Sequence, residues 1–316
     1  MGKGAKRVSK STKKHDTDES EGDKSSDNDA SSSVANTSVA ADRSDDSNGI
    51  SESVEKLSEK RASYRESGLK SLLKVLRGSN EMTVESVRNF IDTICSAISR
   101  MLRRPASLEE GTLCLQLYCL ICLLVGPDEV ELFDQFEPTL LKLVNGMSDF
   151  DELRVTSLAA LAFSSYICAC EAHYRIMTLC EDILCDESEG EPATAILKAR
   201  AAASWTFLAS INSETVVLGR CKARVFEEVV LLLEDNESDV KISAGLTLAA
   251  LWEIADNVVP EVDYAVSGLE LCGNPAKISQ AVALLQKVAK ESSKRISKKD
   301  KKEQVCLDLT YYALLS

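Results

Sequence analysis

Histidine, aromatic residues and the common catalytic motifs are scarce in this sequence. The chain has two histidines, His15 and His173, and only 5% of its 316 residues are aromatic. It lacks a Walker loop and the G-x-G-x-x-G, H-E-x-x-H and G-x-S-x-G patterns. These absences argue against nucleotide-binding, zinc-protease and serine-hydrolase chemistry. We therefore expect no enzyme activity, no cofactor and no small-molecule substrate.

Proline, glycine and long hydrophobic runs are also few. Six prolines and 14 glycines alongside Leu/Ala-rich segments favour an all-helical protein. The longest apolar run, Leu113 to Val125, contains Gln116 and is too short to cross a bilayer. The polar, basic N-terminus does not resemble a secretory leader. We therefore expect no membrane association.

Acidic residues outnumber basic ones, which gives a net charge of −13 and disfavours a uniformly basic nucleic-acid binder. The charge is uneven, however, because residues 3–14 and 287–302 are both rich in lysine. Lysines neutralise phosphates, so a ribosome or RNA contact remains an alternative. The residues predicted for such a contact are Lys294, Arg295, Lys298, Lys299, Lys301 and Lys302.

Most of the 11 cysteines lie inside apolar helical runs, which indicates small buried hydrophobic residues in a reducing compartment. Cys168, Cys170 and His173 are close in sequence but lack a second ligand pair at zinc spacing. We therefore expect no metal site.

A pattern of about 44 residues recurs five times. An apolar or aromatic residue is usually followed by a basic one, then by small or apolar residues four and five positions on and a large apolar residue eight positions on. The starting positions are Tyr64, Leu108, Leu153, Leu197 and Val240. This period is typical of armadillo and HEAT repeats, whose units stack around a continuous core. The sequence predicts an all-α, armadillo/HEAT-like helical-repeat solenoid of about five units with a disordered N-terminal tail.

Apolar periodicity and capping residues place the individual helices. Ser107 and Glu110 form a capping-box pattern, and Trp205 and Trp252 fall at core positions. Each helix that carries the repeat pattern, an inner helix, is expected to pair with the helix that follows it. The predicted helices span 52–77 (with a break near Ser63), 83–103, 107–125, 129–144, 153–169, 171–185, 194–211, 223–233, 238–255 and 277–291.

Composition divides the chain into three parts. Residues 1–52 are rich in serine and acidic residues after a basic start, which is the composition of a disordered tail. Residues 53–292 are predicted to form the repeat domain. Residues 293–316 comprise the basic segment and a short apolar C-terminal stretch.

Several segments are similar to those of a known family. They are SLEEGTLCLQLYCLICLLVGP (107–127), SDFDELRVTSLAALAFSSYIC (148–168), ARAAASWTFLASI (199–211), LLLEDNESDVKISAGLTLAALWEIA (231–255) and KRISKKDKKEQ (294–304). In order and spacing the chain resembles the N-terminal, armadillo-like domain of the interferon-related developmental regulator family. The resemblance implies a non-enzymatic regulator, either a transcriptional co-regulator or a ribosome-binding translation repressor. After Gln304 the sequence VCLDLTYYALLS departs from the family pattern.

Binding to other proteins is the function that these observations favour. A solenoid offers an extended surface, and exposed residues of the inner helices are candidates for partner contact. We expect a transcriptional co-regulator in the nucleus and cytoplasm, with translational regulation as the alternative. The predicted partner-binding residues are Lys198, Arg200, Lys241 and Glu253.

Overall fold

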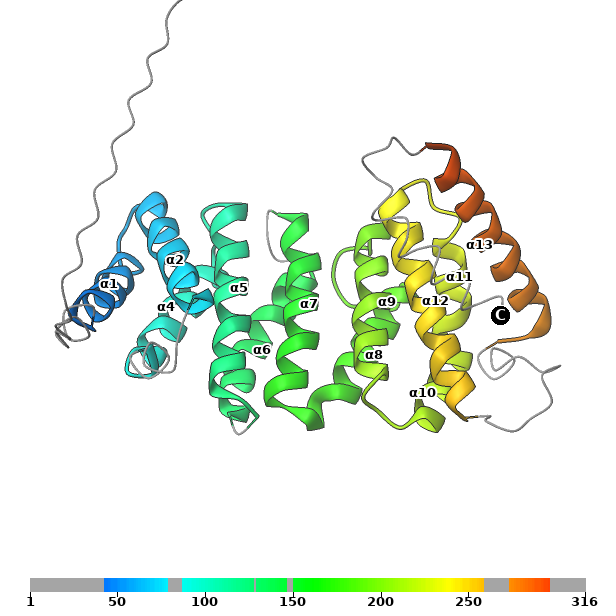
Figure 1. Ribbon diagram of the computed structural model, residues 1–316, viewed down its shortest axis with the longest axis horizontal. Coiled ribbons are helices and arrows are strands. Elements are labelled where there is room, and N and C mark those ends of the chain that lie inside the picture. The colour runs from blue at the N-terminus through cyan, green and yellow to red at the C-terminus, as the bar shows by residue number, and fades with distance from the viewer. Residues whose placement is uncertain (1–42, 79–86, 128, 147–149, 259–272, 296–316) are drawn as a thin grey trace, which may run out of the picture.

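The computed structural model describes residues 43–78, 87–127, 129–146, 150–258 and 273–295. These residues form helices joined by turns and loops, and no strand occurs among them. The helices stand side by side in two rows (Figure 1). The predicted all-α repeat architecture is therefore confirmed.

Five helices form a front row in which each packs against the next (Figure 1). They carry the repeat pattern and correspond to the inner helices of the sequence analysis. They are α2 (Ala62–Arg77), α5 (Leu108–Val125), α7 (Asp151–Cys168), α9 (Ala195–Ala209) and α12 (Ser238–Val258).

The remaining helices form the back row and the two ends of the solenoid. α1 packs on α2 at one end, and α13 packs on α11 at the other. A 3₁₀ turn, Cys170–Ala172, connects α7 to α8, and a π-helical turn, Cys221–Val225, connects α10 to α11. These helices are α1 (Arg43–Lys56), α4 (Ile91–Arg103), α6 (Val130–Val144), α8 (His173–Leu184), α10 (Glu214–Arg220), α11 (Phe226–Leu232) and α13 (Pro275–Arg295).

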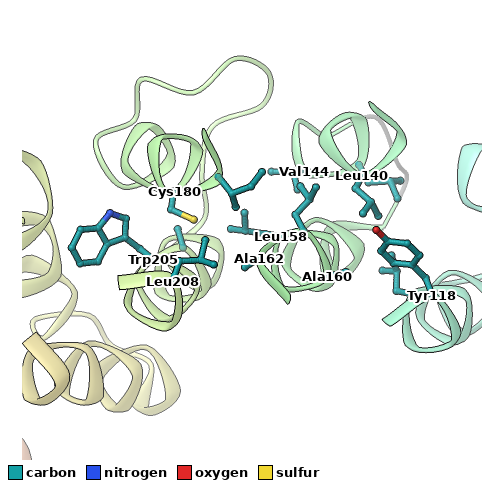
Figure 2. Close-up of a cluster of buried hydrophobic side chains, with 14 of the residues drawn as sticks. Tyr118, Leu140, Val144, Leu158, Ala160, Ala162, Cys180, Trp205 and Leu208 are labelled. Carbon is teal, nitrogen blue, oxygen red and sulfur yellow. The ribbon is translucent and has the colours of Figure 1, made fainter. Parts of the chain in front are cut away.

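The repeat pattern forms the core, and its last three starting positions are confirmed. Leu153, Leu197 and Val240 are all buried. Figure 2 shows how one unit meets the next: Leu158, Ala160 and Ala162 of α7 lie between Tyr118 on one side and Trp205 on the other. The core is therefore continuous from unit to unit, as stacked repeats require.

The first two starting positions were placed wrongly. Tyr64 is 49% exposed, and Leu108 is only partly buried. The buried positions of α2 and α5 align with the later helices when the units start at Gly68 and Glu110, so that the steps are 42, 43, 44 and 43 residues. The predicted start of the α5 unit was wrong because a glutamate occupies the first core position of α5, where the pattern required an apolar residue.

Glu110 is tolerated in the core because its carboxylate has partners. Oε1 accepts a hydrogen bond from Arg65 Nε at 2.6 Å, and Oε2 accepts one from the Ala106 backbone N–H at 2.7 Å. The expected N-cap bond is also present, with the Glu110 N–H donating to Ser107 Oγ at 3.0 Å. A buried carboxylate thus caps α5 and ties it to α2 at the same time.

The predicted helix pairing was wrong. Of the two back-row helices next to it in sequence, each of α5, α7 and α9 packs mainly against the one that precedes it. These preceding helices are α4, α6 and α8. The prediction assumed that two helices joined by a short loop pack against each other. The tight turn after α7 instead places α8 against the next repeat unit, so that the main interface of α8 is with α9.

The helical domain starts earlier than the predicted boundary at residue 53. α1 begins at Arg43, and Ile50 is fully buried against the neighbouring helices. The predicted helix over 223–233 is also longer, since it begins with α10 at Glu214. Of the predicted helix over 83–103, residues 83–86 lie outside the described residues, and α4 itself begins at Ile91.

By length and composition alone, α5 is one helix among the described residues that could cross a membrane. In this fold it packs against α2, α4 and α7 as a repeat helix. Its apolar character beyond the core face is what produces the surface described next.

Candidate protein-binding surface

A shallow apolar groove of about 390 Å³ crosses the outward face of α2, α5 and α7. Leu123 lines this groove and is 53% exposed. The groove is lined by Leu73, Arg77, Leu115, Gln116, Cys119, Leu120, Leu123, Thr156, Ala159, Ala160 and Phe163.

The groove arises because two neighbouring helices have long stretches without a charged residue on any face. α5 has none from Gly111 to Val125, and α7 has none from Val155 to Cys168. A surface helix ordinarily places charged residues opposite its core stripe. Here apolar side chains occupy both sides, and the small Ala159 leaves space beside them.

The apolar face continues beyond the groove onto the next unit. In the repeat register, Leu120, Phe163 and Phe207 occupy one equivalent position on α5, α7 and α9. Tyr166 and Phe207 make an edge-to-face contact with ring centroids 5.1 Å apart, although both rings are substantially exposed. A contiguous exposed apolar surface of this kind is typical of an interaction site.

Arg77 of α2 lines the groove, and Lys70 and Lys74 lie beside it in a neighbouring hollow on the same helix. Lys74 and Arg77 are exposed, and Arg77 Nη2 donates a hydrogen bond to Gln116 Oε1 at 3.1 Å. Lys70, one turn earlier, forms an exposed ion pair with Glu109 at 2.5 Å. The α2 side of the groove therefore presents positive charge, and its nearest exposed carboxylate on α5 is already paired.

Two of the four predicted partner-binding residues lie on this outward face. Arg200 is exposed on α9 at the position equivalent to Thr156, which lines the groove. Glu253 is exposed on α12 at the position equivalent to Leu123 and Tyr166. The structure thus places both residues along the same face, each on a different repeat unit.

The other two, Lys198 and Lys241, occupy the basic position of the repeat pattern. Its equivalent on α7, Arg154, is buried and donates hydrogen bonds to the carbonyls of Val144 at 3.0 Å and Glu191 at 2.8 Å. Lys198 similarly forms an ion pair with Asp186 at 2.5 Å, with its side chain 18% exposed. Arg154 and Lys198 thus hold the segments that follow α6 and α8, away from the groove.

The basic C-terminal residues are only partly described. Lys294 and Arg295 end α13, although the structure describes only their backbone. Lys298, Lys299, Lys301 and Lys302 lie outside the described residues. Their predicted contact with ribosome or RNA stays a prediction.

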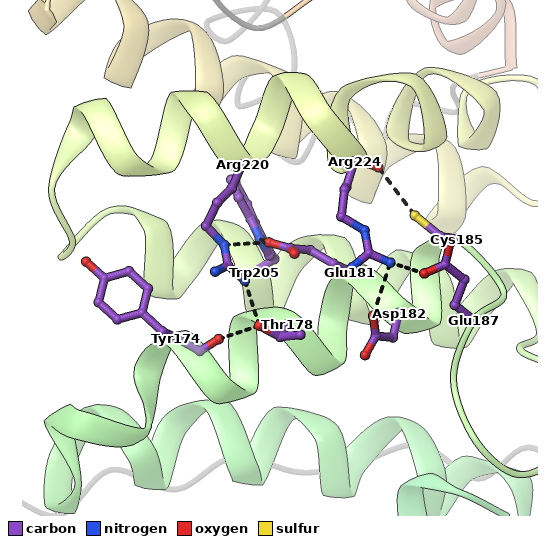
Figure 3. A network of polar contacts seen from close by, with 9 residues as sticks. All are labelled: Tyr174, Thr178, Glu181, Asp182, Cys185, Glu187, Trp205, Arg220 and Arg224. Carbon is purple, nitrogen blue, oxygen red and sulfur yellow. Dashed lines mark hydrogen bonds and ion pairs between the residues drawn. The ribbon is translucent and has the colours of Figure 1, made fainter.

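A second cluster of polar side chains joins α8, α9 and α10 (Figure 3). Glu181 is 3% exposed, and its Oε1 accepts hydrogen bonds from Trp205 Nε1 and Arg220 Nε, each at 2.8 Å. Arg220 Nη2 also donates to Thr178 Oγ1 at 2.8 Å. Because the buried carboxylate is paired with two donors, the cluster functions as a structural joint between helices.

Histidine and cysteine side chains are held by packing. His173 is buried, and its Nε2 lies 3.2 Å from the Ser165 carbonyl oxygen. Burial lowers the pKa of His173, and the hydrogen bond partly opposes this effect. Burial raises the pKa of the Cys95 and Cys119 thiols to about 12, which makes them poor nucleophiles. Among the described residues, no cluster of three or more His, Cys, Asp or Glu could hold a metal ion.

Sequence reasoning missed the groove, although the sequence carried a signal for it. The apolar run Leu113 to Val125 was considered only as a membrane span and as a place for buried cysteines, because apolar residues on all sides usually indicate burial. The groove exists because the outward faces of α5 and α7 lie side by side, and only the three-dimensional arrangement shows this.

The fold and this surface define a helical-repeat scaffold of the armadillo type. The chain belongs to the interferon-related developmental regulator (IFRD) family, whose family model matches residues 14–305. The resemblance noted from the sequence is thereby confirmed.

Solved structures similar to this chain include two designed armadillo repeat proteins. One is 19% identical with a TM-score of 0.45, and the match covers 84% of this chain and 99% of the designed one. The other, solved in complex with the peptide (KR)4, is 17% identical with a TM-score of 0.42, covering 83% of this chain and 99% of the other. The two-row helical packing described above is itself the basis for the fold assignment.

Proposed function

We propose that this chain is a non-enzymatic scaffold that binds other proteins through the outward face of its front row and thereby co-regulates transcription. The observation that carries the proposal is the apolar groove of α2, α5 and α7, with its continuation onto Phe207 of α9. Exposed apolar surface is costly in water unless a partner covers it. Family membership supports a regulatory role, because IFRD members are described as transcriptional co-regulators.

A tethering experiment tests this function. The chain is fused to a DNA-binding domain, recruited beside a reporter gene, and the reporter transcript is measured. We expect the transcript level to change, and Leu123→Gln to abolish the change by placing a polar group in the groove. Leu231→Gln is the matched control, because Leu231 is a comparably exposed leucine, at 47%, on the back-row helix α11. A transcript level that does not respond to recruitment would contradict the proposal.

A role in translation is the second candidate function. The lysine-rich stretch favours it, since Lys287 and Lys290 on α13 lead directly into the basic residues 294–302. Phosphate contacts through lysines weaken steeply with salt. Co-sedimentation with ribosomes should therefore be salt-sensitive and should decrease when the basic residues of 294–302 are replaced by glutamine. A salt-independent or unchanged response would remove this candidate.

The predicted nuclear and cytoplasmic localisation is part of the same proposal. Imaging of the tagged chain in cells tests it, and a signal confined to one of the two compartments would contradict the prediction.

A further inference from the structure

We propose that the groove of α2, α5 and α7 binds a peptide segment in which large apolar side chains are adjacent to acidic ones. This inference rests on the proposed protein-binding function and specifies the partner's chemistry. The apolar side chains would lie over α5 and α7, and the acidic ones would lie over α2.

The apolar half of the site determines the anchor. Leu120, Leu123 and Phe163 are large, while Ala159 and Ala160 leave space between neighbouring helices. No charged residue of α5 or α7 lies among the lining residues. An apolar side chain entering this groove loses water contact without stranding a polar group, which is the requirement for a hot-spot anchor.

The basic half of the site determines the charge. Arg77 lines the groove, and Lys74 lies three positions earlier on the same side of α2, where it lines a neighbouring hollow with Lys70. The hydrogen bond to Gln116 uses one of the five N–H donors of Arg77 and orients its guanidinium toward the groove. An oriented guanidinium favours carboxylate ligands, which it can bind through two hydrogen bonds.

Carboxylates near the groove do not cancel this preference. Glu109 is paired with Lys70, and Glu66, which accepts a hydrogen bond from Ser107 Oγ at 2.5 Å, lines the neighbouring hollow with Lys70 and is not among the groove's lining residues. A basic segment would meet Lys74 and Arg77 as like charges, whereas an acidic one gains their attraction. Arg200, at the equivalent of groove-lining Thr156 on α9, extends the positive border on the far side.

Selection from a displayed library of random peptides tests the proposal on the full chain. We expect enriched peptides to place Asp or Glu beside Leu, Phe or Trp. The double variant Lys74→Glu with Arg77→Glu should instead enrich Lys or Arg beside the same apolar residues. This exchange of preference would show that the α2 border selects the partner's charge, because a merely misfolded variant would enrich no peptide.

Binding measurements then locate the site. Fluorescence anisotropy with the most enriched acidic peptide should show binding that is about tenfold weaker or more for Leu123→Gln and unchanged for Leu231→Gln. Raising the salt concentration should weaken binding to the wild type and to Leu123→Gln by a similar factor, because both keep the charges of Lys74 and Arg77. Circular dichroism of each variant verifies that the helices are retained.

Several outcomes would overturn the inference. They are enrichment of basic peptides by the wild type, enrichment that Leu123→Gln leaves unchanged, and the absence of any enriched peptide. Enrichment only of segments from this chain's own acidic region, residues 16–46, or self-association through the groove would also overturn it. The tethering experiment remains separate, since a transcript change without acidic-apolar selection would retain the scaffold function and reject this partner chemistry.

Discussion

Two neighbouring parts of the solenoid differ in the kind of contact that holds their stacked helices together. Around α5, α6 and α7 the contacts include Tyr118 of α5 stacked on Phe136 of α6 at a centroid distance of 4.4 Å, and apolar side chains also line the outward face of α5 and α7. Around α8, α9 and α10 the contact is centred on the buried carboxylate of Glu181. The first region leaves surface available for a partner, and the second satisfies its polar groups internally.

The difference shows how one repeat architecture separates binding from rigidity. Hydrogen bonds around Glu181 require one geometry of α8, α9 and α10, because displacement would leave a buried charge unpaired (Figure 3). Apolar side chains such as Leu123 impose no such directional requirement. A partner can therefore replace the water that covers them without breaking a hydrogen bond.

Glu181→Ala should have the largest effect on stability. It removes the acceptor shared by Trp205 and Arg220 and leaves a partly buried guanidinium without its carboxylate. We expect a loss of about 3–5 kcal/mol in the unfolding free energy of the α8–α10 region. Urea denaturation combined with hydrogen exchange measures the loss. Glu137→Ala is the control, because its partner Arg175 is 60% exposed and the pair should contribute no more than about 1 kcal/mol.

Gly190→Ala should have the next largest effect. Gly190 has a φ of +105°, and an added Cβ would lie 2.3 Å from the Asn145 carbonyl oxygen, where the two inter-helix loops meet. Strain in such a backbone conformation costs about 1–3 kcal/mol. Gly219→Ala is the matched comparison within α10, where a Cβ meets nothing within 4 Å. That change should raise the unfolding free energy by about 1 kcal/mol through helix propensity, and the thermal midpoint should rise with it. Equal effects of the two substitutions would refute the described loop contact.

Acidification should destabilise the chain partly through His173. Because burial lowers its pKa in the folded state, the unfolded chain takes up a proton near pH 6.5 that the folded chain does not. The stabilising contribution is therefore complete above about pH 6.5 and is lost as the pH falls below that value. Comparing the unfolding free energy of wild type and His173→Gln at pH 7 and pH 5 isolates this contribution. The wild type should lose more stability than the variant, and parallel losses would contradict the assignment.

Leu123→Gln should have the smallest effect on stability. Leu123 is more than half exposed, and glutamine has nearly the helix propensity of leucine, so the unfolding free energy should change by no more than about 0.5 kcal/mol. The same substitution should weaken partner binding about tenfold or more, which distinguishes a docking residue from a core residue. A large destabilisation would mean that Leu123 serves the fold.

The sequence predicted the parts of the fold that depend on local pattern. Leu153, Leu197 and Val240 were identified because an apolar residue and a base recur at fixed spacing, and Arg154 and Lys198 show why the base is needed. Glu110 was missed because its partner, Arg65, lies 45 residues earlier and no local pattern links them. The first part of α1, before residue 52, was missed because its buried Ile50 lies in a segment dominated by serine and acidic residues.

The candidate site depended still more on tertiary structure. Arg200 and Glu253 could be selected as exposed charges from helical periodicity alone. The groove required Leu73, Leu120 and Phe163, which come from three different helices and meet only after the units stack. Helix pairing likewise depends on which surfaces fit together, and the length of the connecting turn did not reveal it.

Site-specific photo-crosslinking in cells tests the central claim most directly. A photoreactive phenylalanine analogue is placed at position 123 on the groove or at position 231 on the back row, both of which are exposed leucines in the wild type. We predict that position 123 yields a discrete crosslinked protein partner and that position 231 does not. Identical crosslinks from both positions, or none from position 123, would contradict the assignment of the front-row groove as the binding surface.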